Sequence, residues 1–304
     1  MDELKHTQKL LIVLVGPTAV GKTSLSLELA KTFNCPILST DSRQFYKEMS
    51  IGTAKPSPEE LSQAEHHFIN SRSIHDRYTA GMFETDAINC LNSIYQKHQI
   101  CVAVGGSGLY INALCYGIDD IPASEEIRER LFERLDNEGL EALQKEVKQI
   151  DPEFYEASDM KNPRRVMRAL EVYEITGKKY SSFRNMSKKP RDFKTLWVGL
   201  EMDLQELYDR INKRVDVMME QGLLDEVKSL YKYKDLKALK TVGYQEMIDH
   251  LDGKIDLKEA VELIKRNTRR FAKKQYTWFR KNEEIKWFQV DQWSEILQHI
   301  QSNK

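Results

Sequence analysis

Residues 10–23 read LLIVLVGPTAVGKT and join a short apolar run to a glycine-rich turn. Leucines at helical spacing follow between residues 24 and 33, so the stretch predicts a strand, a loop and a helix in that order. The loop fits the pattern G-x4-G-K-[ST], in which backbone N–H groups and a lysine surround phosphate oxygens at a helix N-terminus. The candidate phosphate-binding residues are Gly16, Pro17, Thr18, Ala19, Val20, Gly21, Lys22 and Thr23. The Thr23 hydroxyl is also a candidate ligand of Mg²⁺.

Further strands extend this beginning into an α/β domain. The predicted strands after residue 23 are Ile37–Thr40, Ile100–Val104, and residues 196–200 and 285–290. Because strands that alternate with helices favour a parallel sheet, the predicted fold is α/β, with a doubly wound parallel sheet of the P-loop class. We expect the first part of this core at residues 1–122 and the second at 192–304.

A helical subdomain is predicted between the two parts of the core. Between residues 123 and 191 the strand-like runs stop, and charged amphipathic segments replace them. The segments predicted as helices are 125–135, 140–149 and 163–176. The sequence therefore predicts that residues 123–191 form a helical insertion in the α/β core.

Composition favours an ordered cytoplasmic protein. Of the 304 residues, 40% are hydrophobic and 31% are charged, as in ordinary globular proteins. No run of about 18 apolar residues or signal sequence is present, so no membrane association is expected. The four cysteines lack C-x-x-C spacing, which argues against disulfides and structural zinc. Since the net charge is only −1, binding of nucleic acid would depend on local basic helices such as residues 265–281.

An acidic residue follows one predicted strand and is absent after another. Asp41 comes directly after Ile37–Thr40, whereas Ile100–Val104 ends in two glycines. Many P-loop enzymes transfer phosphoryl groups and hold Mg²⁺ with an aspartate at a strand end. Because ligands gather at the carboxyl ends of parallel strands, Asp41 is a candidate Mg²⁺ ligand or a general base that faces the phosphate loop.

Seven stretches of the chain resemble the tRNA dimethylallyltransferases, also called isopentenyl-tRNA transferases. They are GPTAVGKT (16–23), STDSRQFYKEMSIGTAKPS (39–57), VGGSGLYI (104–111), NPRRVMRALEVYEITGK (162–178), GLLDEV (222–227), KTVGYQEM (240–247) and AKKQYTWFR (272–280). They occur in the order typical of the family. The chain is similar to the bacterial members, which lack the C-terminal zinc finger of the eukaryotic enzymes.

The resemblance implies an enzyme that transfers the dimethylallyl group of dimethylallyl diphosphate to tRNA. The acceptor would be N6 of the adenosine 3′-adjacent to the anticodon, in tRNAs that read codons beginning with U. The products would be N6-dimethylallyladenosine and diphosphate. The resemblance also implies Mg²⁺ as cofactor and the tRNA anticodon stem-loop as partner. We expect the protein to be a monomer, although the sequence carries no signal for its oligomeric state.

The resemblance gives catalytic roles to Asp41, Arg214 and Ser107. The exocyclic amine of adenine is a poor nucleophile, so a base must remove its proton during attack, and Asp41 would be that base. Arg214 and Lys22 would stabilise the charge on the departing diphosphate. Ser107 stands where the family usually has threonine, and its hydroxyl would contact the target base. By helical pattern alone, Arg214 would be a solvated arginine.

The resemblance also implies several tRNA contacts. The candidate tRNA-binding residues are Asp41, Ser42, Arg43, Gln44, Ser107, Arg128, Arg164, Arg165, Val166, Met167, Arg168, Lys240, Thr241, Val242, Gly243, Tyr244 and Gln245. Tyr244 could stack on RNA, and Lys240 could reach its backbone. For the arginines at 164–168 the alternative is pairing with Glu171 and Glu174, and for Gln44 it is a plain turn.

Three other functions stay open on the residues alone. A kinase or NTPase would use the loop to bind a nucleotide, and an RNA-binding switch would use it to sense one. An adenylate-type isopentenyltransferase would prenylate free nucleotides, although the long insertion and the basic C-terminal segment favour a larger acceptor. The pair His66-His67 has no third ligand at zinc spacing, so we predict that it is structural or faces RNA.

Overall fold

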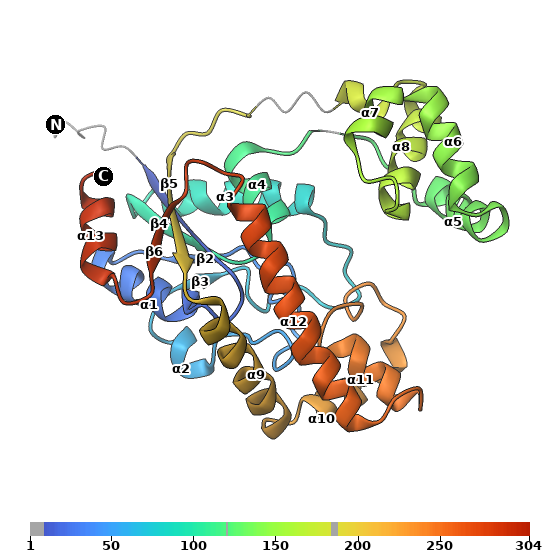
Figure 1. Ribbon diagram of the computed structural model, residues 1–304. Helices are drawn as coiled ribbons and strands as arrows, with labels where there is room; N and C mark the ends of the chain where they lie inside the picture. Colours follow the sequence, from blue (N-terminus) through green and yellow to red (C-terminus); the bar gives the residue numbers. More distant parts are fainter. Residues whose placement is uncertain (1–8, 120, 184–187) are drawn as a thin grey trace. The chain divides into compact units, whose positions relative to one another are not determined.

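The computed structural model describes residues 9–119, 121–183 and 188–304 (Figure 1). The chain forms two compact units, the first from Met1–Cys115 with Pro190–Lys304 and the second from Tyr116–Lys189. The second unit begins at Tyr116 rather than at residue 123, and ends at Lys189 rather than at 191. The Lys189 N–H donates to the Tyr116 carbonyl over 2.8 Å, so the two connecting segments pair with each other within the second unit.

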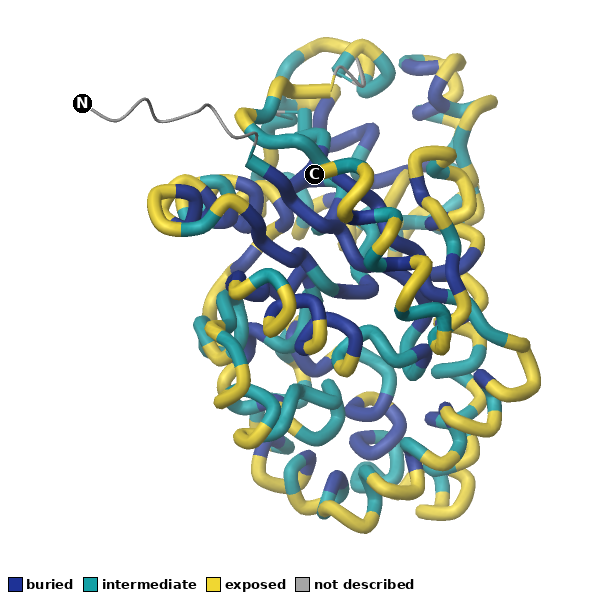
Figure 2. The backbone as a smooth tube through the Cα atoms, turned by 90° about the vertical axis from the view of Figure 1, so that its left-hand side faces the viewer, coloured by how far each residue is buried: buried dark blue, intermediate teal, exposed yellow. Residues whose placement is uncertain are grey.

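Within the described residues, six strands form one parallel sheet in the first unit, in the order β3-β2-β4-β1-β5-β6. They are β1 Leu10–Val15, β2 Ile37–Ser39, β3 His66–His67, β4 Ile100–Val104, β5 Lys194–Glu201 and β6 Lys286–Gln289. Every residue of β1 is buried, so both faces of this strand are covered. Figure 2 shows buried backbone in the interior of the protein, whereas the edge strands β3 and β6 are mostly not buried. The predicted parallel α/β fold is confirmed.

Helices of the first unit surround this sheet. They are α1 Lys22–Phe33, α2 Pro58–Leu61, α3 Ala80–Ile94, α4 Gly108–Tyr116, α9 Leu204–Glu220, α10 Leu223–Leu230, α11 Tyr244–Leu251, α12 Leu257–Phe279 and α13 Trp293–Gln301. Leu29 of α1 and Ile300 of α13 pack with Leu10, Ile12 and Leu14 of β1 in one hydrophobic cluster. In the described part of the chain, no helix has the length and apolar character needed to cross a membrane.

The second unit is helical and has its own hydrophobic core. Its helices are α5 Glu125–Glu138, α6 Leu140–Ile150, α7 Pro152–Ala157 and α8 Pro163–Thr176, followed by a 3₁₀ turn at Tyr180–Phe183. Leu131, Val147, Val166 and Leu170 lie in this core. The α8 helix begins after Asn162, whose side chain accepts the Arg164 N–H, and it ends at a glycine with φ +67°.

Candidate active site

The phosphate loop joins the carboxyl end of β1 to the N-terminus of α1. Lys22 Nζ donates to the carbonyls of Gly16 and Pro17 over 3.0 and 2.7 Å. Desolvation, with repulsion from the Arg214 guanidinium, lowers the pKa of Lys22 from 10.5 to about 7, against the attraction of Asp41. An anion that neutralised these cations would reverse the shift. The loop is therefore arranged to receive negative charge.

Gln275 of α12 holds the phosphate loop from the opposite side. Its Oε1 accepts the Thr18 N–H over 2.8 Å, and its Nε2 donates to the Gly106 carbonyl over 3.0 Å. The side chain is only 6% exposed, so these bonds form away from bulk water. Gln275 was not among the predicted site residues, although it lies in the AKKQYTWFR stretch.

A polar cavity of about 350 Å³ opens in front of the loop. Its walls include Thr18, Lys22, Thr23, Asp41, Gln44, Arg210, Arg214 and Gln275. A second cavity, of about 240 Å³, has mostly apolar walls from α9, α12 and the segment before α11. Its lining includes Ser42, Arg43, Ser107, Ile211, Val215, Met218, Val242 and Ile264. Thr18, Asp41, Thr53, Arg214 and Phe271 line both cavities, so these five residues lie where the polar and apolar spaces meet.

Asp41 follows β2 and lines both cavities. Its Oδ1 accepts the Arg43 N–H over 2.8 Å and the Gln44 N–H over 3.4 Å, which fixes a turn at this strand end. Its Oδ2 has no hydrogen-bond partner among the described residues. One carboxylate oxygen therefore caps the turn, and the other is available to a bound molecule.

Arg214 on α9 points into the same space. Leu207, Ile211 and Val215 of this helix are buried, while Arg214 Nη1 donates to Thr18 Oγ1 over 3.4 Å. Burial lowers the pKa of the Arg214 guanidinium, and the charge of Asp41 opposes that shift. Arg210, one turn earlier, also lines the polar cavity and was not predicted as a site residue.

Ser107 and Gln44 bind protein groups as well as lining cavities. Ser107 Oγ accepts the Ser42 N–H and donates to Ser42 Oγ, both over 3.0 Å, so it joins the segments after β2 and β4. Gln44 Nε2 donates to the carbonyls of Thr53 and Ala54 over 3.3 and 3.1 Å. Both side chains hold loops at the cavity walls.

The predicted tRNA-binding segment 240–245 divides between the apolar cavity, the surface and the interior of the first unit. Thr241, Val242 and Gly243 line the apolar cavity, and Lys240 and Gln245 are exposed. Tyr244 is fully buried, and its hydroxyl donates to Glu226 over 2.6 Å. The expectation that Tyr244 stacks on RNA is therefore wrong, because its ring packs inside the first unit.

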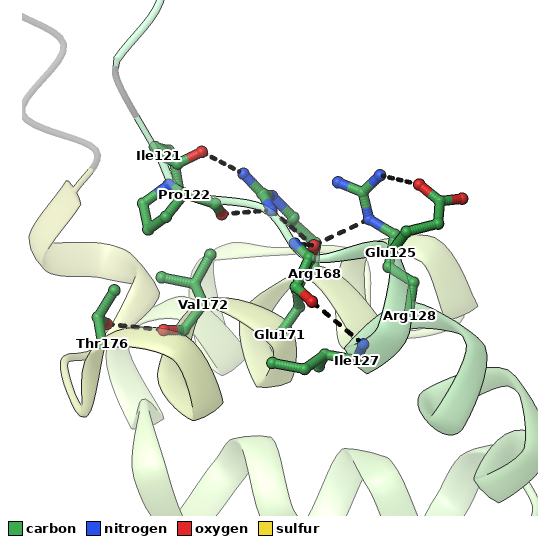
Figure 3. Close-up of polar contacts among 10 residues, drawn as sticks. Ile121, Pro122, Glu125, Ile127, Arg128, Arg168, Glu171, Val172 and Thr176 are labelled. Carbon is green, nitrogen blue, oxygen red and sulfur yellow. Dashed lines mark hydrogen bonds and ion pairs between the residues drawn. The ribbon is translucent and has the colours of Figure 1, made fainter. Parts of the chain in front are cut away.

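The arginines of the second unit separate into two groups. Arg128 Nε and Arg168 Nη1 lie 2.9 and 2.6 Å from the carboxylate of Glu171, which is 1% exposed (Figure 3). Arg168 also donates to the carbonyls of Ile121 and Pro122, each over 2.9 Å. A buried carboxylate requires such partners, so the alternative of pairing with Glu171 holds for Arg168.

The other predicted residues of α8 divide between core and surface. Val166 and Met167 are buried in the helical core, which corrects their prediction as RNA contacts. Arg164 and Arg165 are exposed, and neither has an ion-pair partner among the described residues. They alone of the 164–168 group present free charge at the surface.

No group of three or more His, Cys, Asp or Glu residues in the described ranges could hold a metal ion. Mg²⁺ commonly takes one or two protein oxygens and completes its shell with substrate phosphates and water. The Thr23 hydroxyl and the Asp41 carboxylate both line the polar cavity. The Thr23 hydroxyl fits a magnesium ion that binds together with a diphosphate.

Comparisons with known proteins agree with this arrangement. The IPP transferase family model matches residues 44–282. The chain is 49% identical to tRNA dimethylallyltransferase 1 of Bacteroides fragilis, over 98% of this chain and 99% of the relative. It is 52% identical to tRNA dimethylallyltransferase of Christiangramia forsetii, over 96% of this chain and 97% of the relative. The crystal structure of tRNA isopentenylpyrophosphate transferase from Bacillus halodurans superposes with a TM-score of 0.71 at 38% identity, covering 97% of this chain and 96% of that one.

The parallel sheet and the loop at the end of β1 define a P-loop α/β protein. Most P-loop proteins act on nucleotides, whereas the relatives reported above are named as transferases that act on tRNA. It belongs to the tRNA dimethylallyltransferase family.

Proposed function

We propose that this chain transfers the dimethylallyl group of dimethylallyl diphosphate to N6 of the adenosine 3′-adjacent to the anticodon. The acceptors are tRNAs that read codons beginning with U. The observation that carries the proposal is the position of Asp41 and Arg214, which line both the polar and the apolar cavity. Membership of the family and the activity for which its relatives are named support it.

The polar cavity binds the diphosphate. Ala19, Gly21, Lys22 and Thr23 of the loop line this cavity and supply N–H groups at the N-terminus of α1. The side chains of Lys22 and Arg214 supply cationic charge. Mg²⁺ held by Thr23 would neutralise part of the phosphate charge when bound. The anion replaces the loop carbonyls as the partner of the Lys22 ammonium.

The apolar cavity receives the dimethylallyl chain and the reacting edge of adenine. Ile211, Val215 and Ile264 supply apolar surface beside the Asp41 carboxylate. Such walls exclude water, which would otherwise compete with adenine for the allylic carbon. Ser107 and Ser42 supply hydroxyl groups on the wall at which the base would bind.

The transfer step uses the two residues at the junction of the cavities. N6 of adenine attacks C1 of the dimethylallyl group, and the C1–O bond breaks with its electron pair passing to the diphosphate oxygen. Asp41 accepts the N6 proton through the carboxylate oxygen that does not cap the turn. Arg214 and Lys22 stabilise the negative charge that develops on the diphosphate.

The exposed basic residues bind the tRNA backbone. Arg164 and Arg165 of α8 and Lys240 of the first unit have the exposure and charge needed for phosphate contacts. The proposed enzyme acts as a monomer. The protein acts in the cytoplasm, where its tRNA substrate is found.

Incubation of the purified protein with Mg²⁺, labelled dimethylallyl diphosphate and unmodified tRNA tests the function. AMP and ATP are offered as competing acceptors in parallel reactions. Label in the adenine next to the anticodon is the expected result. Label on AMP or ATP would instead establish a nucleotide prenyltransferase, and γ-phosphate release from ATP without transfer would establish an NTPase.

A further inference from the structure

A short loop between β2 and α2 is bound by a carboxylate from a distant helix. Glu226 of α10 accepts the N–H groups of Ser50 and Ile51 through Oε2, over 3.0 and 2.8 Å, and that of Gly52 through Oε1, over 3.1 Å. Consecutive backbone N–H groups that converge on one point form a typical binding arrangement for an anion. Here the anion is a side chain of the protein itself.

Tyr244 of α11 completes this contact. Its hydroxyl donates to Glu226 Oε1 over 2.6 Å, and its ring is fully buried. Burial, together with the nearby Glu226, raises the pKa of the Tyr244 hydroxyl, so it stays a donor. A Cβ atom on Gly52 would lie 2.4 Å from the ring, so the loop packs against the tyrosine with no space for a side chain.

The loop continues directly into the walls of both cavities. Gly52 lines the apolar cavity, and Thr53 lines the apolar and the polar one. The carbonyl of Thr53 accepts Gln44 Nε2, and the Gln44 N–H donates to Asp41 Oδ1. Hydrogen bonds and the covalent chain between them therefore connect Glu226 through Gly52, Thr53 and Gln44 to the Asp41 carboxylate.

The helix that carries Tyr244 is itself fixed to a cavity wall. Glu246 accepts the Gly243 N–H over 2.8 Å and Asn267 Nδ2 over 2.7 Å, which joins α11 to α12. Thr268, which directly follows Asn267, and Phe271, one turn further along α12, line the apolar cavity. The contact of Glu226 and Tyr244 thus joins the wall formed by α12 to the wall that carries Asp41.

We propose that Glu226 and Tyr244 are positioning residues for the transfer reaction. They hold the loop at residues 50–53, in which Thr53 lines both cavities, and so fix the Asp41 turn. This inference rests on the proposed function, because Asp41 is the base of that reaction. It assigns a role to the GLLDEV and KTVGYQEM stretches, whose glutamate and tyrosine touch neither cavity directly.

Three variants of the full-length protein test this role. Glu226→Gln replaces one acceptor oxygen with a donor that faces N–H groups, and Tyr244→Phe keeps the ring and removes only the hydroxyl. Asp225→Asn is the matched control, because this neighbouring carboxylate on the same helix is 80% exposed and pairs with Lys228. The measurements are amide hydrogen exchange at residues 50–52, single-turnover transfer to tRNA and the dissociation constant of dimethylallyl diphosphate.

We expect Glu226→Gln to speed exchange at residues 50–52 and to lower the single-turnover rate roughly 10- to 100-fold, as for a displaced catalytic group. Tyr244→Phe should also speed hydrogen exchange at residues 50–52 and lower the single-turnover rate, but both effects should be smaller than those of Glu226→Gln. Diphosphate affinity should stay within about twofold, because the hydrogen bonds of Lys22 and Gln275 are to the phosphate loop and Gly106, not to residues 50–53. Asp225→Asn should match the wild type.

Two results would overturn the inference. Faster exchange with an unchanged transfer rate would show that the loop does not position the catalytic groups. Equal losses of rate, diphosphate affinity and melting temperature would show general destabilisation. If the wild type transferred no label to tRNA, the proposed function would fail, while hydrogen exchange would still report whether Glu226 holds the loop.

Discussion

Asp41 combines two roles that a single substitution can separate. Oδ1 caps the turn after β2, and Oδ2 has no hydrogen-bond partner in the described residues, while Asp41 lines both cavities. Asparagine keeps an acceptor oxygen for the Arg43 and Gln44 N–H groups but is no base. Alanine would remove the cap as well, and its effect on catalysis would be mixed with a change in loop structure.

We therefore predict that Asp41→Asn lowers single-turnover transfer by at least about 100-fold, as expected for loss of a general base. The dissociation constants of tRNA and dimethylallyl diphosphate should change little, and the melting temperature should be retained. Rapid-quench transfer and filter binding measure these quantities. Weak tRNA binding with a normal single-turnover rate would remove Asp41 from the base role.

Lys22 permits a second prediction for a single residue. Its ammonium is held by two loop carbonyls and lies beside Arg214 in a site shaped for an anion. Lys22→Met keeps most of the side-chain volume and removes a charge-assisted hydrogen bond of about 1.5–3 kcal/mol. Dimethylallyl diphosphate should bind roughly 10- to 100-fold more weakly by calorimetry.

The control for this change is Lys31→Met, at the exposed end of the same helix. It should leave diphosphate affinity at the wild-type value. Equal affinities for the Lys22 variant and the control would mean that the diphosphate binds outside the polar cavity.

Sequence reasoning found some of these residues and missed others for physical reasons. Lys22 and Thr23 were predictable because the loop motif is local. Gln275 was not, since it meets Thr18 across 257 residues and only the folded sheet brings the two together. Arg214 required the family resemblance, because its helical position fits a solvated arginine equally well.

At the level of secondary-structure elements, helix boundaries are predictable where the sequence contains residues that typically begin or end a helix. The helix α8 has the predicted bounds, because Asn162 and Pro163 start it and Gly177 ends it. The strand β3 was not predicted, because a two-residue strand has no alternating pattern. Its pairing with β2, through His66 opposite Ile37, depends on the tertiary fold.

The arginines of α8 show a further limit of pattern reasoning. Helical spacing places Arg164, Arg165 and Arg168 on neighbouring positions of one helix. It does not specify that Glu171 is buried and pairs with Arg168, as Figure 3 shows. The structure therefore gives two groups of arginines with different expected effects on tRNA binding.

We predict that Arg168→Met destabilises the helical unit by up to about 3 kcal/mol, since the buried Glu171 keeps Arg128 but loses one of its two arginine partners. Hydrogen exchange in residues 124–176 should become faster. The salt dependence of tRNA binding should keep its slope, because Arg168 is engaged by Glu171 and two carbonyls and is not expected to bind phosphate.

The double variant Arg164→Glu, Arg165→Glu provides the opposite case. Hydrogen exchange in residues 124–176 and the melting temperature of this variant should match those of the wild type, since both side chains are exposed. Its tRNA affinity should fall, and the salt slope should flatten by about 1 for each phosphate that the variant no longer binds. An unchanged slope in this variant, or a flattened one in Arg168→Met, would contradict the division of the arginines.

At the level of the whole molecule, the sequence predicted an inserted unit because a long helical stretch interrupts the strand pattern. The exact residues at which this unit begins and ends were not predictable. The segments that connect the units have neither helical nor strand periodicity, and they are paired through the backbone of Tyr116 and Lys189. Backbone pairing of this kind leaves no side-chain pattern in the sequence.

Separate hydrophobic cores make the two units separable by deletion. The cluster around β1 draws only on residues of the first unit, and the cluster around Leu131 and Leu170 draws only on the second. Replacing residues 117–188 with a short glycine linker should therefore leave a first unit that unfolds cooperatively. It should bind dimethylallyl diphosphate with an affinity within a few-fold of that of the full-length protein, because both cavities are lined by the first unit.

Transfer to tRNA and tRNA affinity should be lost together, since Arg164 and Arg165 are removed. Retained tRNA affinity would assign RNA binding to the first unit, with Lys240 and the basic face of α12 as its first candidates, whereas loss of diphosphate binding in a folded protein would show that the polar cavity depends on the insertion.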